Sequence, residues 1–161
     1  MKAREIMNSL VIRVPGNTSI RNVAELMRRE GVGIVCVCDD ENRPRGVITD
    51  RDIVMRAVAS GRSLEHTQAD EIMTTSLLTW RMDADVAEIS QAMKLKRIGR
   101  MLVLDDDGRV AGLITLAEIW HYESPFDAAP VSRTVTEREL RVQPSGGHAD
   151  TDYHADLTPI R

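Results

Sequence analysis

The sequence predicts a mixed α/β (α+β) fold: two tandem β-α-β-β-α repeats packed as a pseudo-twofold pair, followed by a C-terminal tail. The first observation is internal similarity. Shifted by 66 positions, residues 3–53 align without a gap with residues 69–119, and 14 of the 51 pairs are identical. Second, each copy places a helical apolar pattern between β-rich runs. Third, residues 123–161 have no counterpart in the repeat and hold four of the six prolines.

The same order of elements is predicted in both copies. A short strand precedes a helix, whose apolar face in the first copy contains Ile20, Val23 and Met27. A buried strand, an acidic turn and a partner strand ending in Gly-aliphatic-Ile-Thr come next, and a second helix follows at once. The predicted strands are residues 10–14, 34–38 and 46–49 in the first copy, and 77–80, 101–104 and 112–115 in the second.

The repeat pattern also sets the expected domain boundaries. We expect the first repeat at residues 1–60, a linker at 61–68 and the second repeat at 69–122. One repeat is too small to cover both faces of its sheet, so the two copies should cover each other. The polar tail at 123–161 is expected to be partly flexible, or to dock as an arm through the apolar residues of 131–142.

Composition restricts the classes of function. The 161 residues carry a net charge of −4, with a pI of about 5.6, which argues against a nucleic-acid binder that relies on bulk positive charge. No apolar run approaches the length of about 20 residues that a membrane span needs. No secretory signal follows the N-terminus. We therefore expect a cytoplasmic protein with neither a nucleic-acid nor a membrane partner.

The two cysteines, Cys36 and Cys38, fall in a predicted strand. We interpret them as small buried hydrophobes in a reducing compartment. Their side chains are placed on opposite faces of the strand, which would disfavour both a disulfide and shared ligation of a metal. No metal site is predicted, and the acidic run at 105–108 is interpreted as a hairpin turn because it lacks the remaining ligands of a calcium loop.

The start of the second helix in the first repeat carries the residues with the clearest chemistry. Thr49 offers a hydroxyl at a strand end, and Asp52, in the first helical turn, can accept hydrogen bonds from both ribose hydroxyls. Backbone N–H groups around Asp50 and Arg51 form a seat for an anion, and the guanidinium of Arg51 can bind phosphate. The alternative is that Thr49 and Asp52 only cap the helix.

These motifs resemble the cystathionine β-synthase (CBS) domain pair, also called a Bateman module, as found in small bacterial stand-alone proteins. The resemblance rests on residues 46–54, Gly-Val-Ile-Thr-Asp-Arg-Asp-Ile-Val, and on Ala-Arg-Glu-Ile-Met at 3–7, which returns as Ala-Asp-Glu-Ile-Met at 69–73. It covers about residues 1–122. A proline common before the second strand of the family is absent, since Cys36 and Leu102 stand there.

The resemblance implies two ligand clefts, each drawing on both repeats. The second is expected to be weaker, because Glu118 replaces Asp52, and Leu116 and Ala117 replace Asp50 and Arg51. Arg100 is expected to bind phosphate, with a solvated surface arginine as the alternative. The first cleft is expected to contain Thr49, Asp50, Arg51, Asp52, Met73, Leu78, Ile98, Gly99 and Arg100. The second is expected to contain Met7, Ile12, Val32, Gly33, Ile34, Thr115 and Glu118.

Taken together, the sequence predicts a non-catalytic sensor that binds an adenine nucleotide, AMP or ATP, with S-adenosylmethionine or NADH as other ligands. No enzymatic activity is expected, because no histidine stands at motif spacing from a nucleophile or base, and no P-loop or zinc signature occurs. No cofactor is implied apart from the nucleotide, and the protein that receives the signal is not identified. The competing hypothesis is a ligand-free dimerisation scaffold.

A homodimer is also predicted. Small CBS pairs resemble one another in packing exposed helix faces into a disc-like dimer. Apolar residues on the second helices of the two repeats should supply that surface. They are Ile53, Met55, Val58, Ile119 and Trp120.

Overall fold

The computed structural model describes residues 1–122. The predictions for the tail, including the docking arm at 131–142, lie outside the described residues. Among the described helices, none is both long and apolar enough to cross a membrane. The cytoplasmic localisation stays a prediction.

Each element of the second repeat begins 66 residues after its counterpart in the first, and the single helix α6 of the second repeat stands where the first has α3 and η1. The predicted mixed α+β class is confirmed, with two additional short helices, α1 and α4, that the sequence analysis did not predict. The first repeat holds α1 (Ala3–Ile6), β1 (Arg13–Pro15), α2 (Ile20–Glu30), β2 (Ile34–Cys38), β3 (Pro44–Thr49), α3 (Asp50–Asp52) and the π-helix η1 (Ile53–Val58). The second holds α4 (Ala69–Ile72), β4 (Thr79–Arg81), α5 (Val86–Lys96), β5 (Arg100–Leu104), β6 (Val110–Thr115) and α6 (Leu116–Tyr122).

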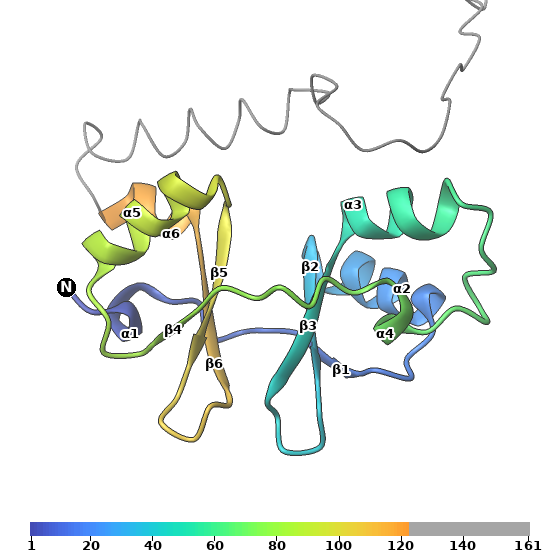
Figure 1. The fold of residues 1–161 in the computed structure, drawn as a ribbon, viewed down its shortest axis with the longest axis horizontal. Coiled ribbons are helices and arrows are strands. Elements are labelled where there is room, and N and C mark those ends of the chain that lie inside the picture. The colour runs from blue at the N-terminus through green and yellow to red at the C-terminus, as the bar shows by residue number, and fades with distance from the viewer. Residues whose placement is uncertain (123–161) are drawn as a thin grey trace, which may run out of the picture.

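Each repeat forms its own three-stranded sheet, in the order β1-β2-β3 and β4-β5-β6. The first two strands of each sheet are parallel and the last two antiparallel. The register is also repeated: Ile34 pairs with Thr49, and Arg100 pairs with Thr115. The two sheets approach each other at the middle of the molecule, and the longer helices lie on their outer sides (Figure 1). The ends of the strands that carry the predicted ligand residues therefore lie near the junction of the repeats.

The opening segments of the two repeats are exchanged. Helix α1 lies with the second repeat, and α4 lies with the first (Figure 1). Ala3 and Ile6 of α1 are buried in the core of the second repeat, whereas Ala69 and Ile72 of α4 are buried in the core of the first. Main-chain hydrogen bonds fix both placements, for example from the Ala3 N–H to the Ala84 carbonyl at 2.9 Å. Neither repeat has a complete core without the other.

Two glycines leave the space that this exchange requires. A Cβ atom on Gly46 of β3 would lie 2.5 Å from Sδ of Met73, which follows α4. A Cβ atom on Gly112 of β6 would likewise lie 2.7 Å from Sδ of Met7, which follows α1. Real Cβ contacts are almost never below 3.0 Å. The glycine of each Gly-aliphatic-Ile-Thr motif is therefore explained by the methionine of the other repeat passing over it.

The placement predicted for the cysteines is wrong in one respect. Residues two apart in a strand share a face, so Cys36 and Cys38 both point towards the second sheet, and their Sγ atoms are 3.6 Å apart. The prediction that they are small buried hydrophobes is confirmed, because they are only 1% and 6% exposed and pack in one cluster with Leu102 and Val110. Both thiols are free.

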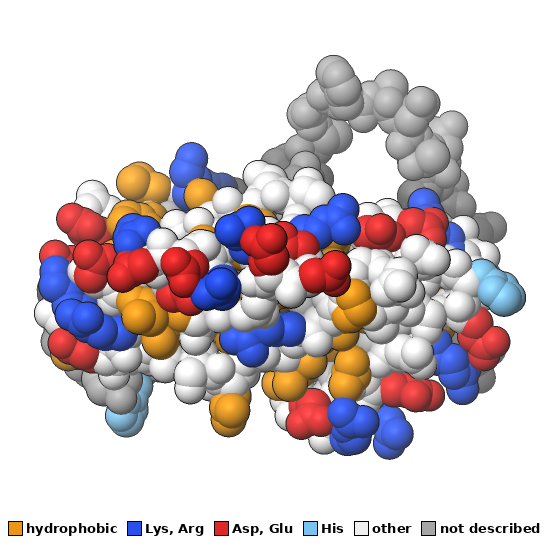
Figure 2. All heavy atoms as spheres, turned by 90° about the horizontal axis from the view of Figure 1, so that it is seen from below, with side chains coloured by type: hydrophobic (Ala, Val, Ile, Leu, Met, Phe, Trp, Pro, Cys, Tyr) orange, Lys and Arg blue, Asp and Glu red, His pale blue; other side chains and the backbone are white. Residues whose placement is uncertain are grey.

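The predicted apolar surface of the second helices is partly wrong as well. Ile53 and Ile119 belong to the cores of their own repeats, because they lie on the inner face of the helix. Met55 and Val58 are 56% and 55% exposed, and Trp120 is 47% exposed. Val54, which was not predicted, is 55% exposed. On another face of the molecule, acidic and basic side chains lie side by side rather than separating by sign (Figure 2).

Candidate functional site

An apolar groove lies at the junction of the two repeats, with a volume of about 160 Å³. Its walls come from the second and third strands of both repeats (β2, β3, β5 and β6), from the segment that joins α4 to β4, and from the loop before β5. Thr74 and Ser76 contribute hydroxyl groups, and Arg100 contributes the single charged side chain in the lining. The lining residues are Ile34, Val47, Thr74, Ser76, Leu77, Leu78, Ile98, Arg100, Met101, Leu102 and Leu113.

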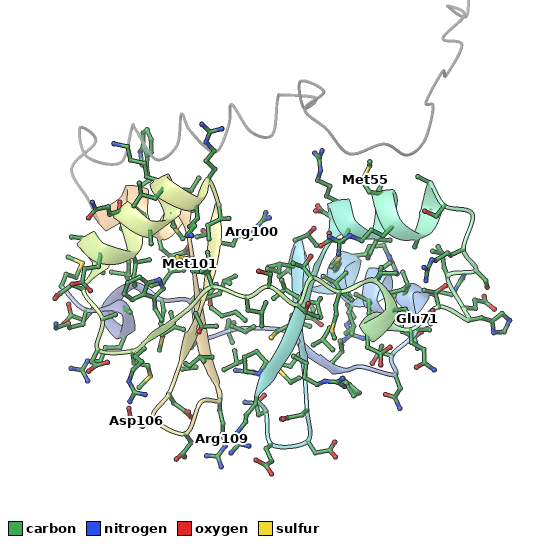
Figure 3. The ribbon with its side chains drawn as sticks, in the orientation of Figure 1. Met55, Glu71, Arg100, Met101, Asp106 and Arg109 are labelled. Carbon is green, nitrogen blue, oxygen red and sulfur yellow. The ribbon has the colours of Figure 1, made fainter. Side chains whose placement is uncertain are left out.

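Arg100 extends from the first position of β5 towards the first repeat (Figure 3). Its Nη2 atom lies 3.8 Å from the position that a Cβ on Gly33 would occupy, and Oδ2 of Asp50 lies 3.3 Å from the same position. Gly33 therefore leaves room for an arginine of one repeat beside a carboxylate of the other. Within residues 1–122, the guanidinium of Arg100 has neither a hydrogen bond nor an ion pair, so its donors are available to a ligand.

Thr49 and Asp52 form a reciprocal cap at the start of α3. The Asp52 N–H donates to Oγ1 of Thr49 at 3.2 Å, while Oδ2 of Asp52 accepts from the Thr49 N–H and from the Thr49 hydroxyl, each at 2.8 Å. The other carboxylate oxygen of Asp52 lies 3.4 Å from Nη2 of Arg56. Capping, the alternative of the sequence analysis, is thus what these two residues do in this structure. A ribose would have to share or displace these bonds.

Arg56 joins this cap to the wall of the groove. Its Nη1 atom donates to the Ile72 carbonyl at 2.8 Å and to the Thr74 hydroxyl at 3.0 Å. Thr74 in turn exchanges two main-chain hydrogen bonds with Val47 of β3, at 2.9 and 3.0 Å. Asp52, which does not line the groove itself, is therefore connected to it through a single side chain.

The second repeat makes a similar cap with different chemistry. Oε2 of Glu118 accepts from the Thr115 N–H at 2.8 Å and from the Thr115 hydroxyl. Leu116 stands where the first repeat has Asp50, and Tyr122 stands where it has Arg56. At the start of the second strand, it is the second repeat that carries the charged residue, since Arg100 there corresponds to Ile34 in the first repeat. Beside Gly33, the carboxylate of Asp50 therefore comes from one repeat and the guanidinium of Arg100 from the other.

The structure brings some of the predicted residues together. Leu78, Ile98 and Arg100, all predicted for the first cleft, line the groove. Thr49 lies at its edge, because it pairs with the lining residue Ile34. Gly33 and Ile34 were predicted for the second cleft, but they lie beside Arg100 and in the groove wall respectively.

Other predicted residues do not line the groove. Met73 and Met7 lie over glycines of the opposite repeat. Ile12 and Val32 pack against the core of the first repeat. Arg51 is exposed, and Gly99 accepts a main-chain hydrogen bond from Leu116. Seven residues that line the groove were not predicted. Those in strands could have been indicated by the alternation of side chains along each strand. The seven are Val47, Thr74, Ser76, Leu77, Met101, Leu102 and Leu113.

Metal ligands do not gather in the described part of the chain: no group of three or more His, Cys, Asp or Glu side chains is placed to hold an ion there. The arrangement around the groove instead offers apolar walls, hydroxyls, a guanidinium and carboxylates. Such a set can bind a flat base and a polar, anionic substituent.

The fold and this groove define an intertwined pair of α+β repeats with a site between them. A family model described as the CBS domain matches residues 3–59 and 69–119. The chain belongs to the CBS domain family, as the motifs at 46–54 and 3–7 indicated.

Curated relatives share the region of the repeats. The chain is 31% identical over 117 residues to hypoxic response protein 1 of Mycobacterium tuberculosis, covering 73% of this chain and 81% of that protein. An uncharacterized protein of Methanopyrus kandleri is 32% identical over 117 residues, or 73% of this chain. That match spans 59% of the Methanopyrus protein, less than two thirds of its length.

Solved structures share the fold. A CBS domain protein of unknown function from Thermoplasma acidophilum has a TM-score of 0.74 at 24% identity, covering 83% of this chain and 75% of that one. The CBS domain pair of protein MJ0100 has a TM-score of 0.67 at 26% identity, covering 75% of this chain and 94% of that one. The latter was crystallised in complex with 5′-methylthioadenosine and S-adenosyl-L-methionine.

Proposed function

We propose that the chain is a non-catalytic regulatory module that binds an adenine nucleotide between its two repeats and passes the bound state on through a homodimer. The observation that carries the proposal is the unpaired guanidinium of Arg100 at an apolar groove. A buried apolar wall suits a purine ring, and a guanidinium with free donors suits a phosphate.

The size of the groove determines which part of the ligand enters it. At about 160 Å³ it is close to an engineered cavity of about 150 Å³ that accepts benzene, and below the 300–1,000 Å³ of sites that enclose a drug-sized ligand. We therefore place the base in the groove, with ribose and phosphate along its edge near Thr49, Asp52 and Arg100. The complex of the MJ0100 pair with two adenosine derivatives supports an adenine-containing ligand.

The test separates recognition of the phosphate from recognition of the base. AMP, ATP, S-adenosylmethionine and NADH are first titrated by calorimetry, with adenosine as the ligand that lacks phosphate. Arg100→Ala should weaken AMP binding at least tenfold, because a hydrogen bond to a charged group contributes about 1.5–3 kcal/mol and about 1.4 kcal/mol is one decade. Adenosine binding should hardly change.

Arg109→Ala is the matched control. Arg109 is an exposed arginine on the hairpin between β5 and β6, at the other end of β5 from Arg100 (Figure 3). Its removal should leave both affinities unchanged. Equal losses for AMP and adenosine in Arg100→Ala would contradict the assignment of phosphate to Arg100.

A ligand-free scaffold is the second candidate, and one observation favours it. The Asp52 carboxylate already accepts two hydrogen bonds from Thr49 and contacts Arg56. If none of the nucleotides binds at millimolar concentration, these groups only cap and connect the elements, and the scaffold becomes the better description.

The homodimer is proposed from the exposed apolar residues of the second helices. Val54, Met55 and Val58 share η1, and each is more than half exposed. A stable contact should bury at least about 1,000 Å². Sedimentation velocity at micromolar concentration should give a dimer, and a monomer would contradict the proposal.

A further inference from the structure

The two thiols of β2 form a pair that packing alone does not explain. Cys36 and Cys38 have their Sγ atoms 3.6 Å apart, within the cluster that joins the two sheets. Their counterparts in β5 are Leu102 and Leu104, so aliphatic side chains fill the equivalent positions of the other repeat. Apolar packing at this junction therefore does not require sulfur.

The backbone permits a bond between the two sulfurs. Consecutive residues of a strand rise about 3.2–3.4 Å, which places alternate Cα atoms about 6.4–6.8 Å apart. This separation lies at the upper end of the range of about 4.4–6.8 Å that disulfides span. The pairing of β2 with β3 is irregular between Val37 and Cys38, where Arg45 of β3 has no partner, so the ladder is already interrupted beside Cys38. A disulfide formed here would be strained and easily reduced.

The surroundings of the pair differentiate the two thiols. The hydrogen bond with Cys36 and, to a smaller extent, the positive charge of Arg13 lower the pKa of Cys38, against the opposing effects of burial and Asp39. The hydrogen bond with Cys38, together with burial, raises the pKa of Cys36. Cys38 also ends the strand and is the more exposed, at 6% against 1%. The two residues thus differ in the way that an attacking and a resolving cysteine differ.

We propose that Cys36 and Cys38 are a site of reversible oxidation, at which a peroxide converts the two thiols into a disulfide within β2. The Cys38 thiolate attacks one peroxide oxygen, the O–O bond breaks, and the leaving oxygen takes a proton to form water. The sulfur of Cys38, now a sulfenic acid, has given two electrons to the peroxide. The Cys36 sulfur then attacks it, the S–O bond breaks, and the departing hydroxyl leaves as water with the Cys36 proton. The balance is two thiols and one hydrogen peroxide to one disulfide and two waters.

The position of the pair gives the bond a structural consequence. Val47, Leu77 and Leu113 pack against the cluster that contains both cysteines, and all three also line the groove. Shortening β2 would therefore displace a wall of the groove. The chemistry of the proposal does not depend on what the groove binds.

The test treats the full chain with a small excess of hydrogen peroxide and follows its intact mass. The expected product has lost two hydrogen atoms, resists alkylation by iodoacetamide in denaturing urea, and regains two alkylatable thiols after dithiothreitol. Cys36→Ser should instead accumulate a sulfenic acid on Cys38 that dimedone traps. Cys38→Ser should react at least tenfold more slowly, since the remaining thiol is the more buried and the less acidic.

Cys36→Ala and Cys38→Ala repeat these measurements, in case a serine does not tolerate burial. An unchanged mass, a gain of oxygen atoms without loss of two hydrogens, or a disulfide between two chains would each overturn the proposal. Equal rates for the two single variants would overturn the assignment of Cys38 as the attacking thiol.

Discussion

Replacing Gly46 with alanine tests the exchange of opening segments directly. The new Cβ would lie 2.5 Å from Sδ, 2.7 Å from Cγ and 3.0 Å from Cβ of Met73. Moving the end of the methionine side chain is not sufficient, because its Cβ is fixed by the backbone. Overpacking of this kind costs about 1–3 kcal/mol. We expect Gly46→Ala to lower the free energy of unfolding by that amount, measured by urea denaturation with circular dichroism.

Removing Met73 provides the control. In Gly46→Ala/Met73→Ala the contacts with Sδ and Cγ are absent and only the Cβ–Cβ contact of 3.0 Å remains, so the double variant should be more stable than the sum of the single effects predicts. The corresponding pair in the second repeat, Gly112→Ala and Met7→Ala, should likewise recover only part of the loss. There, the added Cβ would still lie 3.1 Å from the backbone oxygen of Asn8. Strict additivity of Gly46→Ala and Met73→Ala would refute the reasoning that the methionine determines the glycine.

Three further predictions concern the caps and the exposed helix. Asp52→Ala should lower the free energy of unfolding by about 0.5–2 kcal/mol through loss of the cap with Thr49. If the carboxylate binds ribose, the same change should also weaken the affinity for AMP at least tenfold. Melting curves measure the first effect and calorimetry the second. Glu118→Ala should destabilise by a similar amount but change AMP affinity least, and equal losses of affinity would contradict the unequal sites. Met55→Glu should shift sedimentation from dimer to monomer, whereas Leu10→Glu, a change at another exposed apolar residue, should not.

The internal repeat predicted more of the fold than any single pattern did. Because the sequence returns every 66 residues, the strands, the main helices and the acidic turns could be paired before the structure was known. Helices α1 and α4 were missed because four residues are too few to show helical periodicity. Their only local signal is the glutamate that caps each of them: Glu5 accepts from the Lys2 N–H at 3.1 Å, and Glu71 accepts from the Gln68 N–H at 2.8 Å.

The exchange of these segments could not be read from periodicity. Ala3 and Ala69 are chemically identical, as are Ile6 and Ile72, so the pattern does not say which core each will enter. The same limit explains the missed groove residues. Thr74 reaches the groove only because its segment pairs with Val47 of the other repeat. Contacts of this kind depend on the connection between repeats and not on local side-chain patterns.

The errors on the second helices have a simpler cause. The apolar character of Ile53 and Met55 predicts an interface role for both, but the two residues lie on opposite sides of η1. Hydrophobicity identifies residues that avoid water, and burial is decided by which side of the helix already faces a core. Met55, with its side chain directed away from the sheets in Figure 3, is free to serve an interface between chains.

Under the proposed function, the position of the groove explains why two repeats are needed. A ligand stabilises the conformation that it binds, by an amount set by its concentration and affinity. It shifts the equilibrium between two conformations only when its affinity for them differs. A ligand held by Ile34 of one repeat and Arg100 of the other would favour a particular arrangement of the pair. A ligand confined to one repeat would not.

The same reasoning leads to one dominant site in each chain rather than two equal sites. Among the residues that line the groove, Arg100 carries the one guanidinium, and its counterpart Ile34 provides no charge to a second site. Asp50 likewise has no acidic counterpart, since Leu116 takes its place. A homodimer would then carry two strong sites related by its own symmetry. Binding at each site would change the arrangement of the two repeats within one chain. The exposed face of η1 would transmit that change to the neighbouring chain.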